Sequence, residues 1–119
     1  MELPAPHGVA LVTGGNRGIG RATAQALLAG GHPTVVGSRS GSAPDGVPAV
    51  QMDVTSTQSV NDAFDEIEQN YGPVSVLIAN AGITRDTLLM RMSDDDLDAV
   101  IQANLIGAIR CMRRAARNM

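Results

Sequence analysis

A glycine-rich turn between a strand and a helix constrains the fold of this chain more than any other feature. Residues 8–13 (Gly-Val-Ala-Leu-Val-Thr) are a nearly continuous apolar run, as a strand buried on both faces of a parallel sheet requires. Residues 14–20 (Gly-Gly-Asn-Arg-Gly-Ile-Gly) follow, and apolar residues then recur at helical spacing until Gly30-Gly31 ends the helix. Glycines at a helix N-terminus give a phosphate close access to free N–H groups. We therefore expect a phosphate-bearing ligand at this turn, with a glycine-rich helix entry that holds no ligand as the alternative.

The rest of the chain repeats this alternation of apolar runs and amphipathic stretches. The pattern predicts an α/β fold in which a doubly wound parallel sheet of the Rossmann type is covered by helices on both faces. Ligands of such sheets bind at the carboxyl ends of the strands. The expected elements are strands at 33–38, 49–54 and 74–79, a helix capped by Thr55 and ended by Gly72-Pro73, a short helix or lid at 88–92, and a long helix from Ser93, where Ser93-x-x-Asp96 resembles a capping box.

Composition excludes several classes of function. The net charge is −3, and the chain has one Phe, one Tyr and no Trp, which argues against nucleic acid as a partner. No apolar run approaches the roughly 20 residues of a membrane span, and Met1-Glu2-Leu3-Pro4 does not resemble the start of a signal peptide. One cysteine and two histidines, His7 and His32, are too few and badly placed for a metal site. The single cysteine also fits a cytoplasmic location.

Four motifs in order carry a resemblance to a known family. They are Thr13-Gly14-x-x-x-Gly18-Ile19-Gly20, Asp53-Val54, Asn80-Ala81-Gly82 and Asn104-Leu105-x-Gly107, each on the expected type of element. Together they resemble the short-chain dehydrogenase/reductase family, from about Gly8 to the end of the chain. Residues 82–92 (Gly-Ile-Thr-Arg-Asp through Leu-Met-Arg-Met) are most similar to the 3-oxoacyl-(acyl carrier protein) reductases of fatty-acid synthesis, including the mycobacterial type. A polyketide ketoreductase or another short-chain ketoreductase remains the alternative.

The resemblance implies the residues of a nucleotide site. Asp53 is then the adenine contact, although an ordinary turn cap would also explain an aspartate there. Asn104 is the one member of the family's catalytic set in these residues, and its backbone carbonyl would hold a water of a proton relay at a helix bulge. An asparagine on a helix side bonding to a neighbour is the plainer alternative. The implied cofactor-binding residues are Gly14, Asn16, Arg17, Gly18, Ile19, Gly20, Arg39, Asp53, Val54, Asn80, Ala81 and Gly82.

The end of the second strand indicates the choice of cofactor. An NAD enzyme usually places an acidic residue there to bind the ribose 2′-hydroxyl, but this chain has Ser38-Arg39. Arginine binds a phosphate through paired hydrogen bonds, and Arg17 supplies a second positive charge. We therefore expect NADP(H), with two solvated surface arginines as the alternative.

The family's proton donor is a tyrosine followed four residues later by a lysine. The only tyrosine, Tyr71, has a serine, Ser75, four residues later instead of a lysine, and all nine basic residues are arginines. We therefore expect residues 1–119 to be the dinucleotide-binding part of a single Rossmann domain, incomplete at the C-terminus. The parent protein would reduce 3-oxoacyl thioesters on acyl carrier protein with NADPH, and a catalytically inactive NADP(H)-binding fragment is the alternative.

The last helix raises the question of assembly. In the family it packs against its equivalent in a neighbouring subunit, which implies a homo-oligomer, a dimer of dimers. The apolar residues Leu97, Ile101, Leu105 and Ile109 fit such an interface and fit an ordinary core equally well. The arginines at the end of the helix, Arg110, Arg113, Arg114 and Arg117, are expected to form a charged face.

Overall fold

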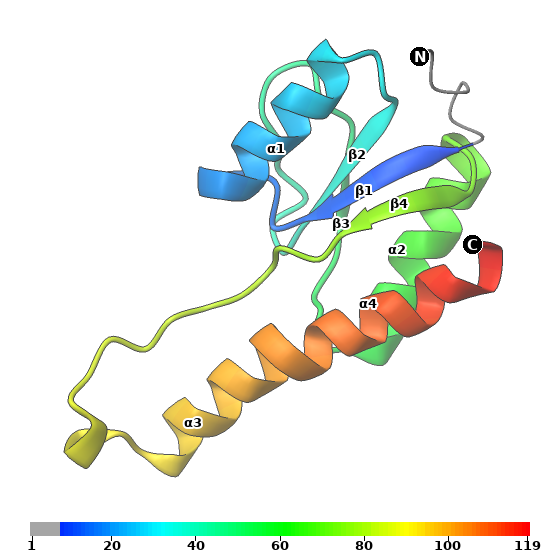
Figure 1. Ribbon diagram of the computed structural model, residues 1–119. Helices are drawn as coiled ribbons and strands as arrows, with labels where there is room; N and C mark the ends of the chain where they lie inside the picture. Colours follow the sequence, from blue (N-terminus) through cyan, green and yellow to red (C-terminus); the bar gives the residue numbers. More distant parts are fainter. Residues whose placement is uncertain (1–7) are drawn as a thin grey trace.

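A four-stranded parallel sheet forms the centre of the computed structural model (Figure 1). The structure describes residues 8–119, so His7 and the N-terminal stretch considered above lie outside the described residues. The strand order is β3-β2-β1-β4, which confirms the predicted α/β fold. The strands are β1 (Val9–Thr13), β2 (Thr34–Ser38), β3 (Ala49–Gln51) and β4 (Val74–Ile78).

Helices cover both faces of the sheet. Helix α1 (Gly18–Ala29) lies on one face, and α2 (Thr57–Asn70) and α4 (Gly107–Ala115) lie on the other (Figure 1). Alternate residues of β1 serve the two layers, as the pleat requires: Leu11 packs into the α2–α4 core with Phe64 and Ile67, and Val12 packs with Ala24 of α1. Strands β1 and β2 are therefore buried on both faces, which explains their continuous apolar runs, whereas most of β4 is only half-buried.

The segment between β3 and α2 differs from the prediction. The strand ends at Gln51, three residues earlier than expected, and the cap of α2 is Ser56, so the prediction of Thr55 as the cap is wrong. The Ser56 hydroxyl accepts the N–H of Ser59 at 3.1 Å, whereas Thr55 bonds back to Asp53. An aspartate that forms a local turn with the second residue after it takes that residue out of the capping position.

The last third of the chain forms an extended arm, residues 79–88, and a long helical rod, residues 94–118. Residues 79–88 extend away from the sheet without regular structure and lead to a short 3₁₀ turn, η1 (Leu89–Arg91), which confirms the short helix expected at 88–92 (Figure 1). The predicted long helix comprises α3 (Asp94–Ile101), a π-helical segment η2 (Gln102–Ile106), α4 and a final 3₁₀ turn η3 (Ala116–Asn118). Ser93 caps its start by accepting the N–H of Asp96 at 3.1 Å, as predicted.

One arginine of the rod is buried, which corrects the expectation of a charged face. Arg114 is only 5 % exposed, bonds Asp65 and Glu68 of α2 at 3.0 and 2.9 Å, and stacks 5.1 Å from the centre of the Phe64 ring. Composition cannot reveal this, because the carboxylates that hold Arg114 lie on another helix.

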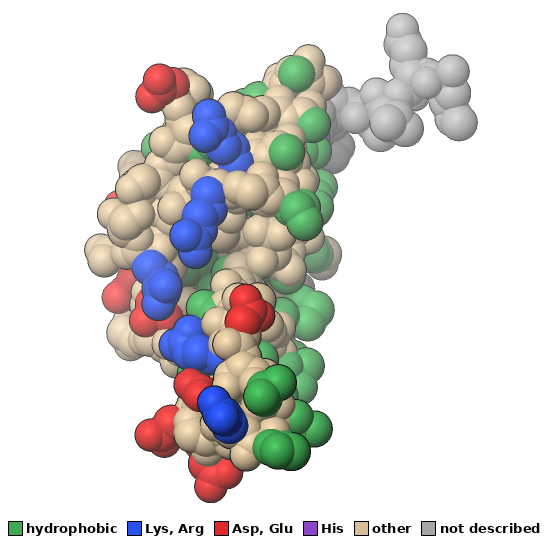
Figure 2. Space-filling view, turned by 90° about the vertical axis from the view of Figure 1, so that its left-hand side faces the viewer, with side chains coloured by type: hydrophobic (Ala, Val, Ile, Leu, Met, Phe, Trp, Pro, Cys, Tyr) green, Lys and Arg blue, Asp and Glu red, His purple; other side chains and the backbone are tan. Residues whose placement is uncertain are grey.

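The apolar stripe along the rod faces outward in this chain. Its four residues Leu97, Ile101, Leu105 and Ile109 are 41–54 % exposed, so they are not core here. Figure 2 shows hydrophobic side chains gathered toward the lower end of the molecule, where η1 and α3 lie in Figure 1. Among the helices of residues 8–119, none has the length and apolar character needed to cross a membrane.

Candidate functional site

A cleft of about 740 Å³ opens at the carboxyl ends of the strands. Strands β2 and β3 lie to one side of β1 and β4 lies to the other, so the order of the sheet reverses between β1 and β4, where ligands of open α/β sheets bind. Of the predicted site residues, the cleft is lined by Gly14, Asn16, Arg17, Gly18, Ile19, Arg39, Asp53, Val54, Asn80, Ala81 and Gly82. Gly20 lies just behind this wall, and Asn104 lines a smaller adjoining hollow with Asn80 and Gly82.

The first turn presents backbone at one end of the cleft. Gly18 has a φ of +59°, and a Cβ on it would meet no atom within 4 Å, so the space before it is open. A Cβ on Gly20 would collide with the side-chain amide of Asn80 and with the carbonyl oxygen of Gly14, so only glycine lets α1 begin this close to the sheet. Arg17 occupies the cap position of α1 without a side-chain hydrogen bond, which leaves the first-turn N–H groups to an external acceptor.

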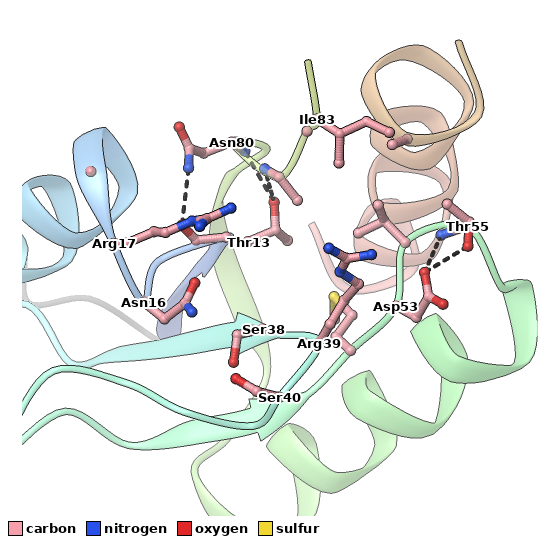
Figure 3. A pocket seen from close by; sticks show the side chains of 18 of the residues that line it. Thr13, Asn16, Arg17, Ser38, Arg39, Ser40, Asp53, Thr55, Asn80 and Ile83 are labelled. Carbon is pink, nitrogen blue, oxygen red and sulfur yellow. Dashed lines mark hydrogen bonds between the residues drawn. The ribbon is translucent and has the colours of Figure 1, made fainter. Parts of the chain in front are cut away.

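Thr13 ties this turn to the Asn80-Ala81-Gly82 turn, and the sequence analysis did not include it as a site residue. It is 2 % exposed, and its Oγ1 accepts the N–H groups of Asn80 and Ala81, both at 3.0 Å (Figure 3). A second hydrogen bond links the same two turns, because the side-chain amide of Asn80 donates to the carbonyl oxygen of Gly14 at 3.2 Å. The last residue of β1 therefore sets the position of the turn after β4, which a threonine at a strand end could have suggested.

Two arginines face the cleft from separate elements. Arg39 rises from the end of β2 into the space between Thr13 and Asp53, and Arg17 enters from the start of α1 (Figure 3). The backbone at Arg39 is fixed by its neighbour Ser38, whose buried hydroxyl donates to the carbonyl oxygen of Ser42 at 2.8 Å. Figure 2 shows arginine side chains in a column over one side of the molecule. This arrangement gives the cleft a positive region that suits an anionic ligand.

Asp53 stands at the opposite end of the cleft from α1. Its Oδ1 accepts the backbone N–H of Thr55 at 2.9 Å and the Thr55 hydroxyl at 2.6 Å, so the aspartate does form the local turn that the sequence allowed. These bonds hold the pKa of the Asp53 carboxyl below its usual value, and the positive charges of Arg39 and Arg110 act in the same direction. The carboxylate is thus fixed in its charged form as a hydrogen-bond acceptor beside the cleft.

Asn104 lies in the π-helical segment. Its Oδ1 accepts the N–H of Ile83 at 2.7 Å and its Nδ2 donates to the carbonyl oxygen of Ile83 at 3.0 Å. The paired bonds join the rod to the backbone just after Gly82. The side chain thus bonds to a neighbouring segment, and the π segment changes the backbone bonding of the residues around it.

Other residues weighed from the sequence lie away from the cleft. Tyr71 follows α2 and precedes β4, at the amino ends of the strands. His32 stands before β2, at the same end. Within residues 8–119, no three His, Cys, Asp or Glu side chains gather closely enough to hold a metal ion.

Comparison with known proteins settles the family. The model of a family described as short chain dehydrogenase matches residues 8–119. The chain belongs to the short-chain dehydrogenase family. This confirms the resemblance drawn from the four motifs, and members of this family bind nicotinamide cofactors.

Curated members of the short-chain dehydrogenase family resemble this chain closely. It is 52 % identical over 109 residues to the 3-oxoacyl-[acyl-carrier-protein] reductase MabA of Mycobacterium avium, covering 92 % of this chain and 43 % of that protein. It is 36 % identical to the 3-oxoacyl-[acyl-carrier-protein] reductase of Aquifex aeolicus, covering 100 % and 53 %. The ligand-free aldohexose dehydrogenase of Thermoplasma acidophilum matches with a TM-score of 0.87 at 31 % identity, over 94 % of this chain and 44 % of that one. The chain spans about half the length of the relatives it matches.

Proposed function

We propose that this chain binds NADP(H), and that the whole protein reduces 3-oxoacyl thioesters on acyl carrier protein to 3-hydroxyacyl thioesters in fatty-acid synthesis. The observation that carries the proposal is the pairing of an open glycine turn with Arg17 and Arg39 around one cleft. At the end of β2 stand Ser38 and Arg39, where a carboxylate would repel a 2′-phosphate. The names of the mycobacterial and Aquifex relatives support the choice of substrate.

The residues present fit a dinucleotide. The uncapped N–H groups of α1 suit a pyrophosphate that approaches over Gly18, where no side chain intrudes. Arg39 and Arg17 would hold the 2′-phosphate, and Asp53 with Val54 would receive the adenine. The turn around Asn80, held in place by Thr13, would support the nicotinamide ribose.

When bound, the cofactor supplies a hydride to the substrate carbonyl. The chain's own contribution is to orient the cofactor and to begin a proton relay at the π-helical segment, where the backbone carbonyl of Asn104 would hold a water. The proton donor and its lysine partner would come from residues beyond these 119, because the chain contains no lysine and Tyr71 lies at the other end of the sheet.

The proposal extends to assembly and location. We infer that the outward stripe of Leu97, Ile101, Leu105 and Ile109 packs on the same stripe of a second copy within a dimer of dimers, because an exposed apolar stripe of this kind marks a contact surface. An acyl carrier protein substrate together with a single cysteine favours the cytoplasm.

The decisive experiment follows NADPH absorbance after adding an acetoacetyl thioester of acyl carrier protein. With the whole protein, the expected result is oxidation of NADPH that depends on the thioester and is unaffected by Tyr71→Phe. Binding of NADPH without any oxidation would favour the alternative of an inactive NADP(H)-binding fragment. Activity confined to bulky cyclic ketones would instead favour a polyketide-type ketoreductase, and absence of NADPH binding would refute the proposal entirely.

A further inference from the structure

Arg110 joins three segments that are far apart in the sequence. It lies on α4, half-buried, and is not part of the wall of the cleft. Its Nε donates to Thr57 Oγ1 at 3.1 Å, its Nη1 to the carbonyl oxygen of Val54 at 3.1 Å and its Nη2 to Gln102 Oε1 at 3.2 Å. The planar guanidinium thus bonds at once to the first turn of α2, the turn after β3 and the π-helical segment of the rod.

Two of these segments border the cleft at its adenine end. Val54 follows Asp53 directly, and both line the cleft, as Gln102 does from the rod. The carbonyl oxygen of Val54 is therefore a point at which the position of the Asp53 turn can be set from outside the cleft. The positive charge of Arg110 also contributes to the lowered pKa of the Asp53 carboxyl.

Gly107 brings the rod and this turn into direct contact. It lies one turn before Arg110, and a Cβ on it would stand 2.7 Å from Val54 Cγ2 and 2.9 Å from Val54 Cβ. The backbone of the rod therefore packs on the Val54 side chain without an intervening group. Close packing and the Arg110 hydrogen bond act on the same residue from the same helix.

The same rod carries Asn104, whose side-chain amide bonds to the backbone of Ile83, which lines the cleft just after the Asn80-Ala81-Gly82 turn. We propose that Arg110 is a positioning residue that sets the adenine-binding turn, Asp53 to Thr55, against the π-helical segment and so fixes the distance between the two ends of the cofactor site. This inference rests on the proposed binding of NADP(H). Lysine cannot replace Arg110, because an ammonium group on a flexible stem does not reach three acceptors in fixed directions.

The test compares two ligands that differ only in the base, adenosine 2′,5′-bisphosphate and ribose 2,5-bisphosphate. Their dissociation constants are measured by calorimetry or NMR for the wild type, Arg110→Gln, Arg110→Lys and Gly107→Ala. Arg113→Gln is the matched control, because Arg113 is an exposed arginine on the same helix. Circular dichroism establishes that each variant is folded under the conditions used.

We expect Arg110→Gln and Arg110→Lys to weaken the adenine-bearing ligand by about tenfold, or about 1.4 kcal/mol, and to leave the base-free ligand unchanged. Gly107→Ala should act in the same direction without removing a charge, and Arg113→Gln should change neither constant. Equal constants for Arg110→Gln and Arg113→Gln, or a parallel loss for both ligands, would overturn the inference while leaving the proposed function intact. If the wild type bound neither ligand, the proposed function itself would fail.

Discussion

Removal of the Thr13 hydroxyl tests how the glycine turn after β1 and the Asn80-Ala81-Gly82 turn after β4 are held together. Thr13 is 2 % exposed, and its Oγ1 accepts the N–H groups of Asn80 and Ala81 at 3.0 Å each. Thr13→Val keeps the shape of the side chain and removes the acceptor. A buried donor without a partner costs about 1–3 kcal/mol. Because Asn80 and Ala81 are half-buried and water reaches part of the turn, we expect Thr13→Val to lower the free energy of unfolding by about 2–3 kcal/mol in total.

Thr13→Ser is the matched control, because serine keeps the hydroxyl and loses one buried methyl, worth about 1 kcal/mol. Urea unfolding followed by circular dichroism gives the two stabilities, and quenching or enhancement of NADPH fluorescence gives the affinity. We expect the valine variant to lose about twice as much stability as the serine variant, and to bind NADPH more weakly. A valine variant as stable as the serine variant would refute the account of this contact.

Other predictions concern the rod and the titrating groups. Arg114→Ala should lower the free energy of urea unfolding by about 3 kcal/mol, and Arg114→Met by less than half of that, because methionine keeps the packing over α2; equal losses would contradict this. Because its pKa is lowered by folding, Asp53 contributes stability that is fully present above about pH 4 and is lost as the pH falls through its folded pKa, so Asp53→Asn should flatten that part of an acid-unfolding curve. Burial raises the pKa of the Cys111 thiol to about 11, so a thiol reagent should label it about a hundredfold more slowly in the native protein than in urea. Fast labelling of the native protein would contradict the burial of this thiol. Ile109→Asp should reduce the oligomer seen by size-exclusion, and an unchanged oligomer would exclude this face as the contact.

The strands and the helix starts followed from the sequence because each depends on local pattern. The apolar run before Gly14 predicts a strand buried on both faces, and it pairs with β2 and β4 on its two edges. Ser93 caps α3 as its spacing to Asp96 predicts. In contrast, Thr55 was expected to cap α2, but its bond to Asp53 competes with that role and the next residue takes it.

What the sequence did not reveal depends on partners distant in the chain. Arg110 and Arg114 stand four residues apart and have the same chemistry, yet one holds Val54 and the other is buried against Asp65. Their partners lie about fifty residues earlier and are brought close only by the crossover of the rod onto α2. A threonine at a strand end suggests a contact of the kind that Thr13 makes, but its partners, the backbone N–H groups of Asn80 and Ala81, lie beyond β4 and are not evident from the sequence.

The central claim is that the cleft binds a nicotinamide cofactor with a 2′-phosphate held by Arg39. The most direct measurement compares the dissociation constants of NADPH and NADH for the wild type and for Arg39→Asp. The account predicts tighter binding of NADPH by the wild type, and a loss of about a hundredfold for NADPH in the variant with little change for NADH. Equal losses for the two cofactors, or a wild type that prefers NADH, would contradict it.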